Sequence, residues 1–129
     1  SSVVVAHNEL KHSAVTGAPT INTLVVPKGG EFSLVLADGT KIWLNADSRL
    51  KYPTSFSGTN REVELEGEAY FEVQHDDQIP FFVKTSQSTI RVYGTTFNVK
   101  AYPDDSFQKT TLETGSIGLF VDDKRYMKH

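Results

Sequence analysis

The chain has 129 residues, of which 38% are hydrophobic and 22% charged. This length suits one domain, because domains commonly run roughly 100–150 residues. The 13 basic and 16 acidic side chains give a net charge of −3, which excludes the clustered positive charge of a nucleic-acid-binding surface. The absence of cysteine excludes a disulfide scaffold, thiolate metal ligands and a cysteine nucleophile. No apolar run approaches the roughly 20 residues of a membrane span.

The first segment, residues 1–20, has a weak pattern for packed structure. A short apolar patch at Val3–Val5 is followed by polar residues and then by Gly17 and Pro19. We therefore expect an N-terminal arm. Because the chain begins at Ser1 and not at Met, we also expect it to be a piece of a longer protein.

From Asn22 onward, hydrophobic residues alternate with polar ones. Phe32, Leu34 and Leu36 predict a strand with one face toward a core, and Asp38-Gly39 then predicts a hairpin turn. The returning strand places Ile42 and Leu44 on one face and Trp43 on the other. The same alternation continues in further short runs, at 61–66, 69–73, 81–83, 90–92, 97–99, 110–114 and 116–121.

About ten short strands with turn signals every 8–12 residues predict an all-β fold. Gly39, Gly67, Gly94 and Gly115 each stand at the start of an alternating run, where a glycine typically allows a positive φ or a bulge. This weak internal repeat is compatible with a two-layer sandwich and with a stacked-sheet, solenoid-like arrangement.

The acidic run Glu62, Glu64, Glu66, Glu68 and Glu72 is the first candidate for chemistry, since paired carboxylates hydrolyse glycosides. Alternation places the first three on one strand face beside Arg61, which is typical of a solvated surface. Glu68 directly follows Gly67, where we expect a structural hydrogen bond to a neighbouring strand.

No metal site or nucleophile is predicted. His75 is the one histidine within the strand region, and it lies in a turn beside Asp76 and Asp77. The paired aspartates lack the spacing of a calcium loop. A sugar-stacking platform is a further possibility, built from Trp43, Tyr52, Tyr70, Tyr93 and Tyr102. For Trp43, packing in the core or between layers is the favoured expectation.

Seven segments together resemble the periplasmic domain of FecR-type anti-sigma regulators, particularly those of gut Bacteroidetes. They are VPKGGEF from Val26, LADGTKIWLNADS from Leu36, LKYP from Leu50, REVELEGEAYFEV from Arg61, PFFVKT from Pro80, VYGTTFNVKAY from Val92 and LETGSI from Leu112. Their order and spacing match from about Thr23 to Leu119. Tyr93, where the family usually has leucine, is a small departure.

The resemblance implies a single-pass inner-membrane regulator. In such a protein a cytoplasmic segment holds an extracytoplasmic-function sigma factor, and the periplasmic part receives a signal from a TonB-dependent outer-membrane transporter. The implied domains are residues 1–20 as an arm after a missing membrane helix, 21–121 as the FecR-like β domain, and 122–129 as a charged tail before a missing C-terminal domain. Contact with the membrane would run only through the missing helix, and no nucleic acid would bind this part.

The resemblance implies no catalytic residue, cofactor or metal. Its motif residues are expected to determine the fold: Asp38 and Gly39 in the hairpin turn, Gly67, Gly94 and Gly115 at strand starts, Trp43, Phe71 and Phe97 in the core or between layers, and Asn45 and Asn98 bonded to backbone. An exposed edge strand is expected at Ser116, Ile117, Gly118, Leu119, Phe120 and Val121. It could pair with the C-terminal domain, with a partner or with a second copy.

Three functions therefore compete on the sequence: a non-enzymatic sensor and relay module, a carbohydrate-binding β-sandwich and a glycosidase. The first follows from the resemblance, the second from Trp43 and the tyrosines, and the third from the acidic run.

Overall fold

The computed structural model describes residues 2–5, 10–11, 20–56, 58–104, 108–114 and 118–121. These residues form twelve strands and no helix, which confirms the predicted all-β fold. The strands are β1 (Ser2–Val5), β2 (Leu10–Lys11), β3 (Ile21–Val26), β4 (Phe32–Val35), β5 (Lys41–Leu44), β6 (Ser48–Pro53), β7 (Arg61–Glu72), β8 (Phe81–Lys84), β9 (Ser88–Val92), β10 (Thr96–Ala101), β11 (Lys109–Thr114) and β12 (Gly118–Val121). Within the described part of the chain, no helix is long and apolar enough to cross a membrane.

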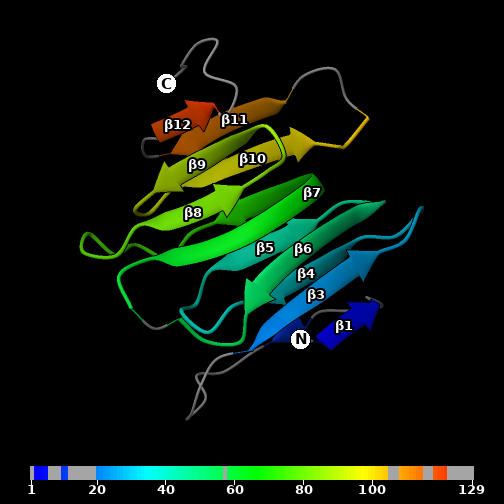
Figure 1. The fold of residues 1–129 in the computed structure, drawn as a ribbon, viewed down its shortest axis with the longest axis horizontal. Coiled ribbons are helices and arrows are strands. Elements are labelled where there is room, and N and C mark those ends of the chain that lie inside the picture. Colours follow the sequence, from blue (N-terminus) through cyan, green and yellow to red (C-terminus); the bar gives the residue numbers. More distant parts are fainter. Residues whose placement is uncertain are drawn as a thin grey trace.

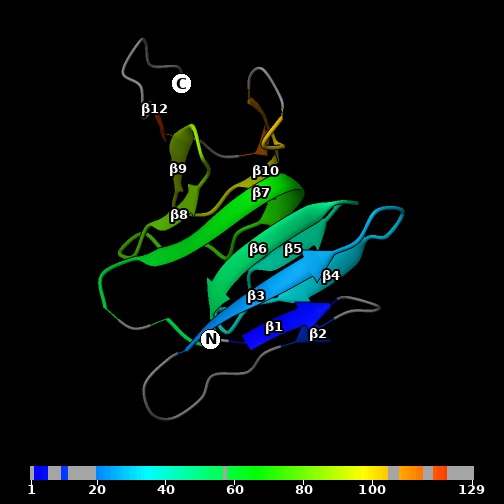
Figure 2. The ribbon, with the colours of Figure 1, turned by 45° about the vertical axis from the view of Figure 1, so that its right-hand side comes forward.

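The strands pack as two layers that share β7 (Figure 1). The front layer, as seen in Figure 1, has the order β1-β3-β6-β7-β8-β9-β12, and the rear layer has the order β2-β4-β5-β7-β10-β11. Most pairs are antiparallel, while β1–β3, β2–β4 and β7–β8 are parallel. The two layers enclose the core as in the first of the two predicted arrangements, and the strands of each layer follow one another along the sandwich (Figure 2).

Strand β7 is twelve residues long and passes from one layer to the other. Its first half pairs with β6 and β8 in the front layer, and its second half pairs with β5 and β10 in the rear layer. Gly67 lies at the crossing with φ +112°, and a Cβ there would lie 2.7 Å and 2.8 Å from Ser48 Cβ and Cα. Glycine therefore allows both the backbone turn and the close approach of β6.

The core lies between the layers and draws on both. Phe71 of the rear layer stacks on Phe97 at a centroid distance of 5.0 Å and meets Phe81 of the front layer edge-on at 6.5 Å. These three side chains are fully buried, as are the aliphatic residues that alternate along β3, β4, β6 and β9. The predicted period-two pattern therefore does place its apolar residues in one continuous core.

The segment 1–20 contributes more than the expected arm. β1 adds a parallel strand to β3, and β2 adds one to β4, so each layer gains an edge strand from this segment. The apolar patch at Val3–Val5 is rich in β-branched residues, and that composition favours a strand.

Arg61 corrects the sequence interpretation that placed it beside the surface glutamates. Its residue is only 3% exposed, because it shares the inward phase of Val63 and Leu65. The guanidinium donates to Asp38 Oδ2 at 2.8 Å and to the carbonyl oxygens of Gln74 and Ile79, and it lies 5.4 Å from the Phe81 ring centroid. A buried ion pair therefore joins the β4–β5 turn to the start of β7, and the hydrogen bonds of Arg61 connect both to the loop between β7 and β8.

Candidate functional site

The outer face of the front layer carries oppositely charged side chains that pair across neighbouring strands. Glu66 lies 3.9 Å from Arg49, and Glu62 lies 3.3 Å from Lys84, with about half of each side chain exposed to solvent. Ion pairs with this exposure contribute little to stability. The structure thus agrees with the interpretation of this part of the acidic run as a solvated face.

Gly67 divides the acidic run between the two outer faces of the sandwich. Glu62, Glu64 and Glu66 belong to the front layer, whereas Glu68 and Glu72 belong to the rear layer. Glu68 and Glu72 are four residues apart on one strand, or about 13 Å at a rise of 3.3 Å per residue. Glycosidase carboxylates stand roughly 5–9.5 Å apart. The two carboxylates on the rear face are therefore farther apart than a glycosidase pair, whereas successive members of the front-face set, Glu62, Glu64 and Glu66, lie about 6.6 Å from one another at the same rise.

The outer face of the rear layer carries an aromatic and polar row. The register aligns Ser33 of β4 with Trp43 of β5, Trp43 with Tyr70 of β7, and Tyr70 with Asn98 of β10. Neighbouring members of such a row are separated by the strand spacing of about 4.8 Å. Residues from positions 33 to 98 of the chain therefore form one continuous surface.

Trp43 lies on this surface and not in the core or between layers, so the expectation for it was wrong. It is 41% exposed, although its neighbours Ile42 and Leu44 are buried. Its alternation was correctly identified, but in the described part of the chain no third layer covers this face. The ring packs instead against Tyr70, with centroids 5.6 Å apart and planes inclined by 57°.

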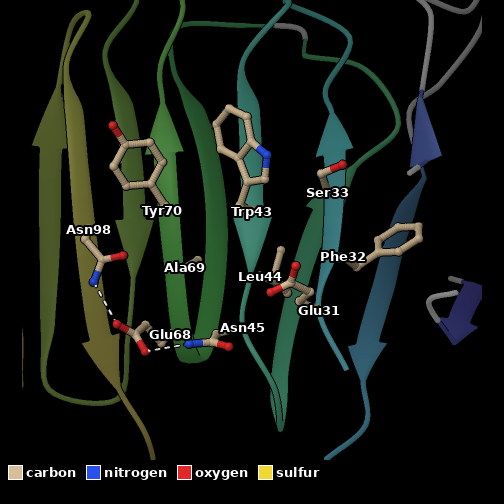
Figure 3. Close-up of a pocket in the computed structure, with 10 residues that line it drawn as sticks. All are labelled: Glu31, Phe32, Ser33, Trp43, Leu44, Asn45, Glu68, Ala69, Tyr70 and Asn98. Atoms are coloured by element: carbon tan, nitrogen blue, oxygen red, sulfur yellow. Dashed lines mark hydrogen bonds between the residues drawn. The ribbon is translucent and has the colours of Figure 1, made fainter. Parts of the chain in front are cut away.

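The two rings form one side of a groove of about 530 Å³ (Figure 3). We call it the aromatic groove. It is lined by Glu31, Phe32, Ser33, Trp43, Leu44, Asn45, Glu68, Ala69, Tyr70 and Asn98. In Figure 3 the rings of Trp43 and Tyr70 point toward the viewer, and the carboxylates of Glu31 and Glu68 lie below them on opposite sides.

Glu68 is held in place by two asparagines. Its Oε1 accepts a hydrogen bond from Asn45 Nδ2 at 3.0 Å, and its Oε2 accepts one from Asn98 Nδ2 at 3.0 Å. These bonds tie the end of β5 and the middle of β10 to β7, so Glu68 makes the hydrogen bonds to neighbouring strands that the sequence predicted. Asn45 also accepts from the backbone N–H of Ala46 at 2.8 Å, whereas the bond found for Asn98 goes to a side chain and not to backbone.

Tyr70 is oriented by a carboxylate on the next strand but one. Its hydroxyl donates to Glu113 Oε1 of β11 at 2.8 Å. This hydrogen bond, with smaller contributions from desolvation and from the charges of Glu113 and Glu72, raises the pKa of the Tyr70 phenol. Tyr70 therefore stays protonated and presents a neutral ring beside Trp43.

The other three tyrosines of the predicted platform do not join this surface. Tyr52 is buried in the core, Tyr93 follows β9 in the front layer, and the Tyr102 hydroxyl donates to the Ala46 carbonyl oxygen at 2.7 Å. The structure thus reduces the predicted five-residue platform to Trp43 and Tyr70. The sequence did not identify Ser33 and Glu31 as groove residues. Alternation shows that they face outward, but it does not show which strands lie beside theirs.

His75 lies in an exposed turn, as the sequence indicated. Its Nε2 is 2.9 Å from Asp77 Oδ1, and both side chains are mostly exposed. No group of three or more His, Asp or Glu side chains that could hold a metal ion occurs within the described ranges.

The motif glycines and Asp38 have different structural roles. Gly39 has φ +94° in the β4–β5 turn, where Asp38 accepts hydrogen bonds from the backbone N–H and the hydroxyl of Thr40. Gly94 has no positive φ, contrary to one of the two roles the sequence suggested for such glycines. A Cβ at Gly94 would lie 2.6–2.9 Å from His75, so close packing requires glycine there. Gly115 lies outside the described residues.

The expected edge strand is described only in its second part. β12 (Gly118–Val121) pairs antiparallel with β9, and among the described residues no strand pairs with its other side. Ser116 and Ile117 lie outside the described residues. β11 ends the rear layer at the same end of the sandwich (Figure 1). The described part of the chain therefore has two strand edges at this end.

Comparison with known proteins finds similarity to one protein family and to two solved structures. A model of the family described as FecR protein matches residues 22–118. Two crystal structures, each of a proposed anti-sigma factor from Parabacteroides distasonis ATCC 8503, are similar in fold and sequence. One has 37% identity and a TM-score of 0.79 over 81% of this chain, and the other has 38% identity and a TM-score of 0.77 over 79%. This chain spans 49% and 48% of the lengths of those proteins. No curated protein matches it.

Proposed function

The chain belongs to the FecR protein family, and on that basis we propose that it is the periplasmic sensor and relay module of a transmembrane anti-sigma factor. The observation that carries the proposal is the family match over residues 22–118, together with 37–38% identity to two proposed anti-sigma factors. The resemblance of the seven motif segments, in order and in spacing, supports the same role.

In the proposed mechanism, the module carries a signal and performs no reaction. A TonB-dependent outer-membrane transporter that has bound its substrate contacts the module through its signalling domain. The membrane regulator then releases an extracytoplasmic-function sigma factor held by a cytoplasmic segment. The two strand edges at β11 and β12 support this role, since an open edge can accept a further strand from a partner or from a C-terminal domain of the regulator itself.

The geometry of the acidic run also supports a non-catalytic role. Its carboxylates face two opposite sides of the sandwich, and the one that lines the aromatic groove, that of Glu68, is engaged by Asn45 and Asn98. If any hydrolysis of glycans were measured with the purified domain, we expect Glu68→Gln and Glu72→Gln to leave it unchanged.

The proposal is tested by isolating the whole regulator from membranes of the native host, under mild detergent and with an affinity tag. We expect a sigma factor and an outer-membrane transporter to be recovered with it and identified by mass spectrometry. An unrelated single-pass membrane protein with the same tag is the control. Recovery of neither partner, or equal recovery with the control, would contradict the proposal.

A further inference from the structure

We propose that the aromatic groove on the rear layer binds an arginine side chain carried by a partner protein. That the partner is a protein rests on the proposed relay role. The arginine itself is inferred from the chemistry of the groove.

The two outer faces of the sandwich differ in how their charges are balanced. On the front layer, Arg49 and Lys84 lie close to glutamates, so opposite charges already neutralise one another across the strands. On the rear layer, the groove is lined by two carboxylates, those of Glu31 and Glu68, and by no cationic side chain. Lys100 stands opposite Glu68 in the register but does not line the groove. A positively charged ligand therefore fits the aromatic groove and not the paired charges of the front face.

The rings of Trp43 and Tyr70 can bind a cation. Trp43 is 41% exposed, and a tryptophan face is the strongest of the aromatic sites for a cation. Tyr70 stands beside it at an inclination of 57°, and its hydrogen bond to Glu113 fixes its orientation. Two inclined rings on a rigid sheet form a preorganised corner, which lowers the entropic cost of binding.

Among the cationic side chains, arginine fits the groove best. A planar guanidinium can stack on an aromatic ring while its edge donates to a carboxylate, which a lysine ammonium cannot do as well. The groove offers both kinds of partner on one surface, with the rings above and the carboxylates below (Figure 3). Glu68 accepts one hydrogen bond at each oxygen from Asn45 and Asn98, and a carboxylate has about four lone-pair sites. It therefore keeps acceptor capacity for a guanidinium.

Trp43 provides the measurement, because it is the one tryptophan in the sequence. The domain is titrated with a capped peptide, Gly-Ser-Arg-Gly-Arg-Ser-Gly, and with the same peptide carrying citrulline, a neutral isostere of arginine, at both positions. We expect a saturable change in Trp43 fluorescence with the arginine peptide and a much smaller one with the citrulline peptide. A third titration uses cellohexaose and maltohexaose, because an aromatic corner is also a chemical match for a sugar.

Variants locate the site. Glu31→Gln removes one groove carboxylate from an exposed position, and we expect it to weaken arginine-peptide binding by at least about threefold, the size of one exposed cation contact. Glu64→Gln, at an exposed position on the front face, is the matched control and should leave binding unchanged. Trp43→Ala, followed by calorimetry, should abolish binding while the thermal unfolding midpoint stays close to that of the parent.

Equal binding of the arginine and citrulline peptides, binding of neither, or binding of the saccharides alone would overturn the assignment. The outcome is separate from that of the membrane isolation. If the partners are recovered but arginine does not bind, the relay role stands and the groove assignment fails. If arginine binds but no partner is recovered, the groove is a cation site and the relay role fails.

Discussion

Asp38 contacts more of the molecule than its place in a hairpin turn requires. One oxygen accepts from the backbone of Thr40, and the other accepts from the Thr40 hydroxyl and from the buried Arg61 guanidinium. Thr40 in turn accepts from the backbone N–H of Gln74 at 3.1 Å. A residue that the sequence assigns to local turn geometry therefore also neutralises a charge buried between distant segments.

Asp38→Asn should destabilise the domain by about 3 kcal/mol, because it leaves the Arg61 charge buried without a carboxylate. Urea denaturation followed by circular dichroism measures this. Glu66→Gln, which removes the exposed pair with Arg49, is the control and should cost less than about 1 kcal/mol. Equal costs for the two variants would contradict a special role of the buried pair.

Tyr52 makes the free energy of unfolding depend on pH in the alkaline range. Burial raises the pKa of its phenol above the usual value, and a hydrogen bond with Asn22 opposes this in part. The folded state thus favours the protonated phenol. This contribution is fully present below the unfolded pKa of about 10 and is lost as the pH rises through the higher folded pKa. We expect Tyr52→Phe to be less stable than the parent at pH 8, with the difference shrinking above pH 10, as measured by chemical denaturation. A difference that stays constant over this range would refute the linkage.

At the level of the elements, the chain changes layer at short connections, and Gly94 shows what such a connection requires. It lies between β9 of the front layer and β10 of the rear layer, with His75 packed against it. The sequence marked this position through its repeated glycines. It could not show that a neighbouring backbone, and not a positive φ, excludes a side chain.

Gly94→Ala should cost about 1–3 kcal/mol through the collision of its Cβ with His75. Gly30→Ala is a matched control, because its Cβ would meet its nearest neighbour at 3.4 Å without a positive φ. The control should stay within about 0.5 kcal/mol of the parent. If both alanines melt like the parent, the close approach at Gly94 is not a constraint.

The β12 edge allows a test with two adjacent prolines. In an antiparallel strand, successive N–H groups point to opposite sides, so Leu119→Pro and Phe120→Pro remove one N–H directed at β9 and one directed away from it. We expect one variant to lower the unfolding midpoint. The other should fold like the parent but fail to recover the transporter or the sigma factor when built into the whole regulator. If the well-folded variant recovers both partners normally, the edge is not the contact.

For the whole molecule, the sequence predicted the all-β fold class and the residues of the core, but not which residues meet on each outer surface. Alternation identified which residues face inward, and Phe71 and Phe97 are buried accordingly. The acidic run was correctly interpreted as solvated in its first half. Trp43 was misplaced because alternation gives the side of a strand and not what lies beyond it. Arg61 was misplaced although alternation puts it on the inward side with Val63 and Leu65. Similarly, the aromatic groove depends on the register of four strands, which no local pattern contains.

Because β7 is shared by both layers, we expect the two layers to unfold together as one cooperative unit. The amides of β7 pair with both layers, so neither half can exchange without disrupting the layer it belongs to. Hydrogen exchange should give both halves of β7 the same, highest free energy of opening, while β12 at the edge opens at lower cost. Halves that differ by more than about 1 kcal/mol would show that the layers unfold separately.

The passage of β7 through both layers has a mechanical consequence. Because one covalent strand carries hydrogen bonds of each layer, the layers cannot slide past one another without breaking bonds on both sides of Gly67. A force applied at the β12 edge or on the aromatic groove therefore moves the described sandwich as one rigid body. On this geometry, a displacement of one edge of the described sandwich is carried to the opposite edge without a change in its internal pairing.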